Sequence, residues 1–410
     1  MRRFGSQLAG GLARVEVTGV LAPFAEGFRK ALTGQGFSRW VVANHTHLMA
    51  HLSSWLGERG LDPGRLAAEA VGAFVAARRA DGYRFLVSRR GLVPLLEYLY
   101  GLGVVPKMAE ATPAGPVEQL LAEYRTYLRS ERGLAPLSVL RYLGTARLFL
   151  SGLEPPLEAT LEDLSAGQVT SFVVEEAGRR RVWAAKSLVT ALRSLLGFLH
   201  VAGHIRRGLA TAVPSVAGWR LSGLPRGIGG EQVAAMLASC DRSTPMGRRD
   251  YAILLLLSRL GMRNGEVARL ELGDVDWQAG QLLVRGKGNR FETLPLPVDV
   301  GQALVDYLSD GRSVRIRSRR LFVIARAPYT GLTLSGMCSV VVAAGRRSGV
   351  GPVSPHRLRH TVASELLARG APLVEIGQLL RHRAEVTTAI YAKLDHRALG
   401  GLTRPWPGAS

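Results

Sequence analysis

The chain has 410 residues, and this length suggests two or three domains instead of one core. A hydrophobic content of 47% excludes global disorder. The 53 Lys and Arg residues against 32 Asp and Glu give a net charge of +21, which is spread along the chain and favours an extended nucleic-acid surface. Codon bias would explain Arg in place of Lys, but not the shortage of acidic residues.

The cysteines and the apolar segments indicate the compartment. Cys240 and Cys338 fit a reducing interior without disulfides or a zinc site, and we expect both to pack in the core. No long apolar region follows the N-terminal arginines, so no signal peptide is expected. The longest apolar stretch, residues 252–257, is too short to span a bilayer. The sequence therefore predicts a cytoplasmic protein with no membrane partner.

The first two blocks of the chain are predicted to be helical. In the first, Trp40 and Trp55 are expected in the core, and the helices are 24–32, 41–56, 66–78 and 91–102. Residues 107–116, rich in Pro, Gly and Ala, are typical of a linker. The second block has predicted helices at 117–129, 136–150, 165–176 and 184–201.

These two blocks have similar sequences. Residues 36–38 match 133–135, 71–75 match 169–173, and 95–103 match 195–203, an offset of roughly a hundred residues. Such self-similarity indicates a duplicated four-helix module. The alternative is that two small bundles share a hydrophobic pattern by chance.

The third block, after a looser seam at 213–230, mixes helices with strands. Strand-like residues 282–285 and 291–294 flank a Gly-Lys-Gly-Asn turn and predict a hairpin. The predicted helices are 231–238, 250–260, 300–308, 334–347, 354–369, 372–380 and 386–394.

The helix that starts at Ser354 and Pro355 carries side chains suited to a phosphate. His356, Arg359 and His360 lie three and four residues apart, so one helix face presents all three. A guanidinium beside an imidazole suits the two non-bridging oxygens of a phosphate.

Two further residues complete this run. His382 follows a leucine pair, and Tyr391 comes nine residues later in the expected final helix. A lone histidine is more often packed or solvated, but an ordered set of such residues favours a functional site.

Arg263 and Lys287 occupy turns upstream. Arg263 follows Gly261 between two helices, where an ordinary surface arginine is the alternative. Glu266 can either orient Arg263 or cap the next helix. Lys287 lies at the tip of the hairpin, where a solvated lysine is the alternative, but an ammonium can donate a proton and a guanidinium cannot. The arginine-rich stretch 312–320 fits either a DNA-backbone contact or a solvated loop.

The third block resembles the catalytic domain of the tyrosine recombinase (phage integrase) family. Three stretches carry the resemblance: 248–266, 286–289 and 355–391. The second block resembles the family's core-binding domain. One departure is Arg381, because the family usually has Gly immediately before the histidine at position 382. That Arg could strain the turn or add a DNA contact.

The resemblance implies catalytic roles for Arg263, Lys287, His356, Arg359, His382 and Tyr391. Tyr391 would attack the scissile phosphate, form a 3′-phosphotyrosine link and release a 5′-hydroxyl, to which Lys287 would give a proton. His360 fits the family pattern too and is expected to support the fold.

The remaining implied roles concern charge. Arg263 and Arg359 would clamp the non-bridging oxygens, with His382 as a third donor. His356 would assist proton movement and phosphate binding. The covalent bond stores the phosphodiester energy and cations replace Mg²⁺, so no cofactor and no metal are expected.

The predicted fold class is mainly α with a small β component: two helical bundle modules and a mostly helical catalytic domain with a small antiparallel sheet. The predicted domains are an N-terminal helical module that could be a duplicate (1–110), a core-binding DNA-binding domain (111–212), the catalytic domain (213–395) and a C-terminal tail (396–410).

We therefore expect a site-specific recombinase or integrase that serves integration, excision or transposition of a mobile element. Its expected partners are double-stranded DNA, other copies of the chain in a tetramer on DNA, and other recombinases of the same element. The alternatives are a partner-dependent recombinase subunit, a non-catalytic architectural DNA-binding protein and a type IB topoisomerase.

Overall fold

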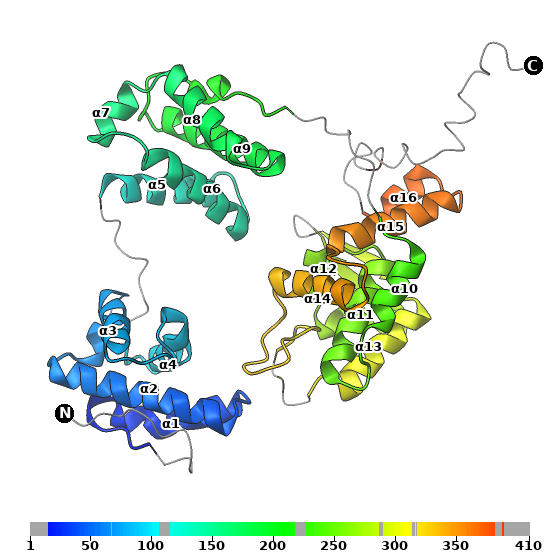
Figure 1. Cartoon of the computed structure of the whole chain (residues 1–410), viewed down its shortest axis with the longest axis horizontal. Helices are drawn as coiled ribbons and strands as arrows, with labels where there is room; N and C mark the ends of the chain where they lie inside the picture. Colours follow the sequence, from blue (N-terminus) through cyan, green and yellow to red (C-terminus); the bar gives the residue numbers. More distant parts are fainter. Residues whose placement is uncertain are drawn as a thin grey trace, which may run out of the picture. The chain divides into compact units, whose positions relative to one another are not determined.

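The computed structural model describes residues 15–66, 68–105, 115–217, 227–286, 290–313, 316, 318–381 and 388. These residues form mostly α-helices together with one three-stranded antiparallel sheet (Figure 1). The predicted fold class is confirmed. The three blocks are described separately below.

The N-terminal block is a helical bundle whose core includes Phe28, Leu52 and Phe74. Its helices are η1 (Gly19–Phe24), α1 (Ala25–Gly34), α2 (Arg39–Glu58), η2 (Pro63–Arg65), α3 (Ala68–Ala80) and α4 (Arg89–Gly101). Trp55 is buried as predicted. The prediction for Trp40 was wrong: it lies in the first turn of α2, is 52% exposed and contacts the exposed Phe85 edge to face.

The second block is a compact helical unit with its own hydrophobic core. Its helices are α5 (Pro116–Ser130), α6 (Pro136–Leu150), α7 (Leu157–Glu162), α8 (Ala166–Gly178), α9 (Val182–Val201) and η3 (Leu209–Ala212). The short α7 was not predicted. Among the described residues, α9 alone is long and apolar enough to cross a membrane, and 50% of its apolar window is buried in the structure, as in the core helix of a bundle.

Two pairs of glycines matched between the first and second blocks share a backbone conformation. Gly36 and Gly133 have φ of 84° and 56°, and Gly103 and Gly203 have φ of 70° and 81°. A left-handed conformation is easy only for glycine, and each of these glycines lies two or three residues after the end of a helix. This agreement supports the hypothesis of a duplicated module.

A buried helix, α11, lies at the centre of the third block. Helices α10, α12, α13, α14 and α15 pack against α11 (Figure 1), and α16 packs against α15. The helices of the block are α10 (Gly230–Ala238), α11 (Pro245–Arg259), α12 (Asn264–Arg269), η4 (Leu272–Asp274), α13 (Val298–Asp310), α14 (Leu334–Arg347), α15 (Pro355–Ala368) and α16 (Leu373–Leu379). Helix α11 begins five residues earlier than predicted, because the Thr244 side chain caps it and Pro245 occupies its first turn. The predicted helix at 386–394 lies outside the described residues, except Thr388.

The sheet consists of β1 (Val275–Asp276), β2 (Gln281–Arg285) and β3 (Phe291–Pro295). Strands β2 and β3 pair as the predicted antiparallel hairpin, with Leu282 opposite Leu294. The two-residue β1 was not predicted. Residues 287–289, at the hairpin tip, lie outside the described residues.

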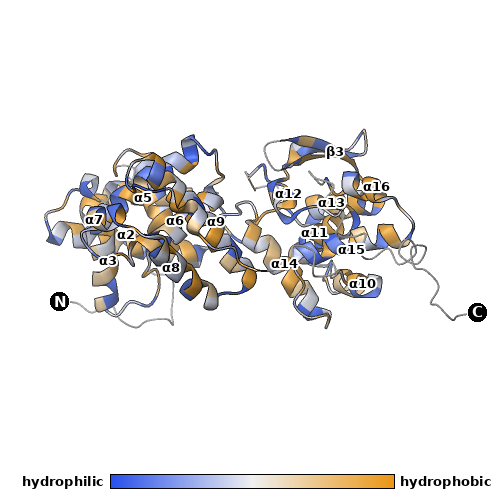
Figure 2. Cartoon of the chain, turned by 90° about the horizontal axis from the view of Figure 1, so that it is seen from above, coloured by the Kyte–Doolittle hydropathy of each residue, from blue (hydrophilic) through white to orange (hydrophobic). Residues whose placement is uncertain are grey.

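Hydrophobic and hydrophilic residues alternate along the helices (Figure 2), as amphipathic helices that cover a core require. Cys240 lies in the core of the third block as predicted. Cys338 is exposed on α14, so that prediction was wrong. The neighbouring Met337 and Val341 supply the buried face of this helix, and Cys338 lies on the other side.

Candidate active site

Arg359 is held by backbone carbonyl groups from two separate segments. It lies on the buried face of α15, and the residue is 2% exposed. Its Nη1 donates to the Gly261 carbonyl oxygen at 2.5 Å, and its Nη2 donates to the Leu380 carbonyl oxygen. The main chain on either side of the guanidinium therefore fixes its position.

Gly261 is needed for this arrangement for two reasons. Its φ is +55°, in the left-handed region that favours glycine. A Cβ there would also lie 2.6 Å from Cδ2 of the buried Leu380. Glycine thus lets the chain leave α11 and point its carbonyl oxygen at Arg359.

Arg263 is held by the Glu266 carboxylate, in the first turn of α12, and by one backbone carbonyl group. Its Nη1 donates to Glu266 Oε1 at 2.7 Å, and its backbone N–H donates to Glu266 Oε2 at 2.8 Å. Both alternatives for Glu266 are therefore confirmed, since it caps the helix and orients the arginine. The Nη2 of Arg263 donates to the Arg381 carbonyl oxygen at 2.6 Å, and the side chain is 38% exposed.

Glu266 is ionised although it is buried. Burial raises the pKa of its carboxyl group, but the Arg381 charge and hydrogen bonds from Arg263 and Arg381 outweigh burial, so the pKa lies below its ordinary value. The carboxylate thus supplies one negative charge between two arginines.

Arg381 occupies a strained turn after α16. Its φ is +55°, which agrees with the expectation that an arginine strains this turn. Its side chain is only 4% exposed, and its Nη2 donates to Glu266 Oε2 at 2.7 Å. The other expectation, a DNA contact by Arg381, does not fit this burial. The side chain is turned inward to the Glu266 carboxylate.

His356 and His360 lie one turn apart on α15, with ring centroids 4.4 Å apart. Desolvation, then the charges of Arg359 and Arg263, lower the pKa of the more exposed His356. Desolvation, then the charges of His356 and Arg359, lower the pKa of His360 to about 4. Both rings are therefore neutral at pH 7, so His356 can accept a proton there.

The turn at residues 380 and 381 connects the two predicted arginines. The Leu380 and Arg381 carbonyl groups, which follow each other in the chain, accept hydrogen bonds from Arg359 and Arg263 respectively. The structure thus brings these two side chains to one turn, which immediately precedes position 382. Lys287, His382 and Tyr391 lie outside the described residues. The buried role of Arg381 was missed, and its positive charge at a usual glycine position was the only signal.

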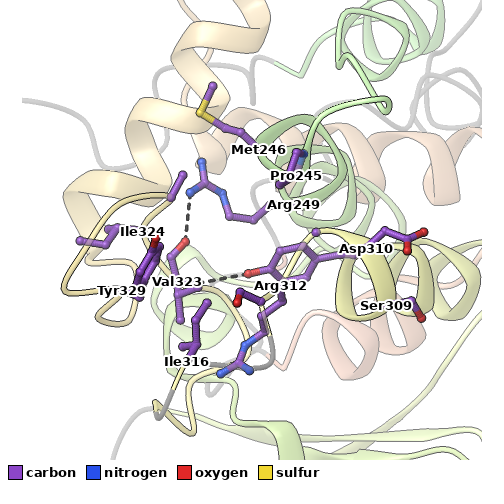
Figure 3. Close-up of a pocket in the computed structure, with 14 residues that line it drawn as sticks. Pro245, Met246, Arg249, Ser309, Asp310, Arg312, Ile316, Val323, Ile324 and Tyr329 are labelled. Carbon is purple, nitrogen blue, oxygen red and sulfur yellow. Dashed lines mark hydrogen bonds between the residues drawn. The ribbon is translucent and has the colours of Figure 1, made fainter. Parts of the chain in front are cut away.

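A cavity of about 440 Å³ lies elsewhere in the third block (Figure 3). Arg249, Tyr307 and Tyr329 contribute to its wall, and none of the six predicted catalytic residues does. Arg249 pairs with Asp250 at 2.7 Å and donates to the Val323 carbonyl oxygen at 3.0 Å. These contacts connect α11 to the segment around Val323, so Arg249 serves the fold.

The arginine-rich stretch 312–320 is partly held by the protein itself. Arg312 donates to the Arg320 carbonyl oxygen at 3.3 Å, and Arg320 donates to the Arg269 carbonyl oxygen at 2.6 Å. Arg320 and Arg319 also lie 3.7 and 3.9 Å from the Glu271 carboxylate. Residues 314, 315 and 317 lie outside the described residues.

Sequence comparison identifies the family. Residues 227–397 match the phage integrase family. The chain is 41% identical to the integrase/recombinase y4rA of Sinorhizobium fredii over 95% of this chain and 94% of that protein. The chain belongs to the phage integrase family of tyrosine recombinases. It is therefore an enzyme of the DNA breaking and rejoining class.

Other tyrosine recombinases share a smaller part of the chain. It is 29% identical to the tyrosine recombinase XerD of Listeria monocytogenes, over 67% of this chain and 94% of XerD. About a third of this chain therefore lies outside the part that matches XerD.

Solved structures of tyrosine recombinases have the same fold. The post-cleavage complex of the XerH recombinase with its difH substrate has a TM-score of 0.54, with 18% identity over 72% of this chain and 97% of XerH. A lambda integrase tetramer bound to a Holliday junction has a TM-score of 0.52, with 17% identity over 79% of this chain and 90% of that chain.

Proposed function

We propose that this tyrosine recombinase is site-specific and cleaves and rejoins DNA through a 3′-phosphotyrosine intermediate at Tyr391. One observation carries the proposal: the turn at residues 380 and 381 holds both Arg359 and Arg263 by successive carbonyl groups. Two guanidinium groups fixed in this way suit the two non-bridging oxygens of a phosphodiester. His382 follows this turn directly and supplies the third donor.

The reaction is an exchange of one phosphodiester for another. The Tyr391 oxygen attacks phosphorus and forms the new P–O bond, while the bond to the 5′-oxygen breaks. Lys287 gives the departing oxygen its proton, and His356, neutral at pH 7, takes the proton that the Tyr391 hydroxyl loses and contributes to phosphate binding. In the reverse step a 5′-hydroxyl attacks the phosphotyrosine and regenerates the tyrosine.

In the proposed reaction, positively charged side chains stabilise the negative charge of the transition state. The arginines and His382 neutralise the charge that develops on the phosphorane, as positioned cations do in phosphoryl transfer. The phosphotyrosine conserves the energy of the broken bond, so neither ATP nor a metal takes part in the proposed steps.

Double-stranded DNA is the proposed partner, and a homotetramer on DNA is the proposed assembly. Recombination joins two duplexes, each cut on both strands, so four nucleophiles are needed. The XerH complex contains its difH substrate, and the lambda integrase assembly is a tetramer on a Holliday junction. The net charge of +21 fits contacts to phosphates along an extended surface.

We propose a separate role for each domain. Residues 111–212 would bind the core DNA site, residues 213–395 would carry the chemistry, and the tail 396–410 would dock on a neighbouring protomer. The N-terminal module, 1–110, would bind outer DNA sites or other recombinases of the same mobile element. Integration, excision or transposition of that element, in the cytoplasm, is the proposed role.

Covalent trapping tests the reaction class. The purified protein and a Tyr391→Phe control are mixed, without metal, with nicked DNA that carries the ends of the native locus, and then run on a denaturing gel. We expect a slow-migrating protein–DNA adduct with the native protein and none with the control. Tight binding without an adduct would point to a partner-dependent subunit or an architectural protein. An adduct with relaxation but without strand exchange would point to a topoisomerase.

A further inference from the structure

We propose that Arg381 is a positioning residue, which aims Arg263 at the scissile phosphate through the Glu266 carboxylate. The proposal rests on the proposed function, because it assigns Arg381 to the same phosphate site. In the usual family pattern a glycine occupies this position, so the arrangement belongs to chains that carry an arginine here.

Arg381 contacts both Arg263 itself and the Glu266 carboxylate that holds Arg263. Its side-chain Nη2 donates to Glu266 Oε2 at 2.7 Å, and that carboxylate accepts from Arg263 through both of its oxygens. Its carbonyl oxygen accepts directly from Arg263 Nη2 at 2.6 Å. One residue therefore fixes both the carboxylate that orients Arg263 and one of the guanidinium nitrogens.

The ion pair between Arg381 and Glu266 is buried, and this strengthens its effect on the orientation of Glu266. The side chains of Glu266 and Arg381 are 1% and 4% exposed, whereas that of Arg263 is 38% exposed. A buried carboxylate keeps its orientation only when its oxygens are held by donors. Without the Arg381 side chain, Glu266 Oε2 would lose its charged donor, and the carboxylate would be held by Arg263 alone.

The backbone conformation is a second observation in favour of a role. A side chain at φ +55° is strained, whereas glycine adopts this conformation readily. Strain of this kind persists where the surroundings impose it and is common at functional sites. Here the surroundings include an ion pair to the carboxylate that holds a proposed catalytic arginine.

The same conformation provides a clean variant. Arg381→Gly removes the guanidinium while its backbone adopts φ +55° without strain, so the carbonyl contact to Arg263 can remain. Arg381→Lys keeps a positive charge without the planar fork and should restore part of the function. The matched control is Glu292→Gln, because Glu292 is an exposed ion-pair partner of Arg381, 3.8 Å from its Nε, on the side of the guanidinium that does not contact Glu266.

The experiment compares two substrates. One is the nicked DNA with its native phosphodiester, and the other carries a methylphosphonate at the scissile position, which removes one negative oxygen. The rate of covalent adduct formation is measured for the native protein and the three variants on each. A misaimed Arg263 matters most where the full charge must be neutralised.

We expect Arg381→Gly to slow adduct formation about 10- to 100-fold on the phosphodiester, but by less than about threefold on the methylphosphonate. Arg381→Lys should be intermediate, and Glu292→Gln should match the native protein. An equal loss on both substrates would overturn the proposal in favour of a general structural defect. A native rate in Arg381→Gly would overturn it as well.

The two proposals fail differently. If the native protein forms no adduct with either substrate, the proposed reaction is wrong and the role of Arg381 falls with it. If the native protein forms the adduct and Arg381→Gly leaves the substrate preference unchanged, only the role of Arg381 is wrong.

Discussion

The two arginines of the candidate site are held by different kinds of contact. Arg359 is buried and donates to the carbonyl oxygens of Gly261 and Leu380. Arg263 is more exposed and depends on the Glu266 carboxylate, which in turn pairs with Arg381. Carbonyl oxygens therefore hold Arg359, whereas Arg263 is held by one carbonyl oxygen and also by side-chain ion pairs.

This difference determines what a mutation can do. Carbonyl groups move only when the backbone moves, so changes around Arg359 should affect folding and chemistry together. The ion pairs around Arg263, unlike its contact to the Arg381 carbonyl oxygen, can be changed one side chain at a time. Substitutions around Arg263 should therefore lower the reaction rate while most of the stability remains.

The largest effect should distinguish the two arginines directly. Arg359→Ala leaves two carbonyl oxygens without their donor in a buried site, and we expect it to lower the free energy of unfolding by about 3–5 kcal/mol. Arg263→Ala should cost only about 1 kcal/mol, because the side chain is 38% exposed and Arg381 still pairs with Glu266. Both should reduce adduct formation by at least about 100-fold.

Urea unfolding followed by circular dichroism measures the stability of both variants. If Arg263→Ala lost as much stability as Arg359→Ala, the two arginines would not differ in how they are held.

Glu266→Gln should have the next largest effect. It removes the nearer and buried counter-charge of Arg381, and we expect a loss of about 2–3 kcal/mol together with slower adduct formation. The folded pKa of Glu266 lies below its unfolded value, so its contribution is present above the unfolded pKa and is lost as pH falls through the folded pKa. Unfolding from pH 7 down to pH 3 should therefore show a weaker acid dependence in Glu266→Gln. Parallel pH profiles would contradict this.

Gly261→Ala tests whether the Gly261 carbonyl group positions Arg359. The new Cβ would meet Leu380 Cδ2 at 2.6 Å, and φ of +55° would become strained. We expect a loss of about 2 kcal/mol and slower adduct formation, because the carbonyl oxygen that holds Arg359 must shift. Gly280→Ala, at φ 61° with open space around its Cβ position, is a control for strain alone. Equal rates of adduct formation in the two variants would indicate that the Gly261 carbonyl does not position Arg359.

The smallest effect concerns pH and His360, which lies beside His356 and Arg359. The folded pKa of His360 is about 4, below its ordinary 6.5, so the unfolded chain binds a proton between these pH values and the folded chain does not. Stability is therefore complete above about pH 6.5 and falls toward pH 4, by about 1–2 kcal/mol between pH 7.5 and pH 5. His360→Asn should flatten this slope in urea unfolding, and an unchanged slope would assign it to other groups.

Much of the fold could be predicted from the sequence, because its local signals agree with its packing. Helices α6 and α14 have the predicted bounds, and the β2–β3 hairpin forms around the predicted turn. The placement of His356, Arg359 and His360 on one helix follows from their spacing and the Ser-Pro start. The approach of Arg263 to Arg359 required the family resemblance, since it joins segments about a hundred residues apart in the chain.

Other features depend on tertiary contacts that local patterns do not specify. The strand β1 has only two residues, and its pairing with β2 defines it. Trp40 and Cys338 were expected in the core from their residue type, but their helices face solvent at these positions. The inward turn of Arg381 depends on Glu266, which is 115 residues away in the sequence.

Identifying the residue that becomes linked to the DNA tests most directly whether Tyr391 is the nucleophile. The trapped adduct is trimmed with nuclease, digested with trypsin and analysed by mass spectrometry. The account predicts a nucleotide phosphate on Tyr391, in the peptide that spans residues 384–393. A phosphate on any other residue, or DNA that is bound with no covalent link, would contradict it.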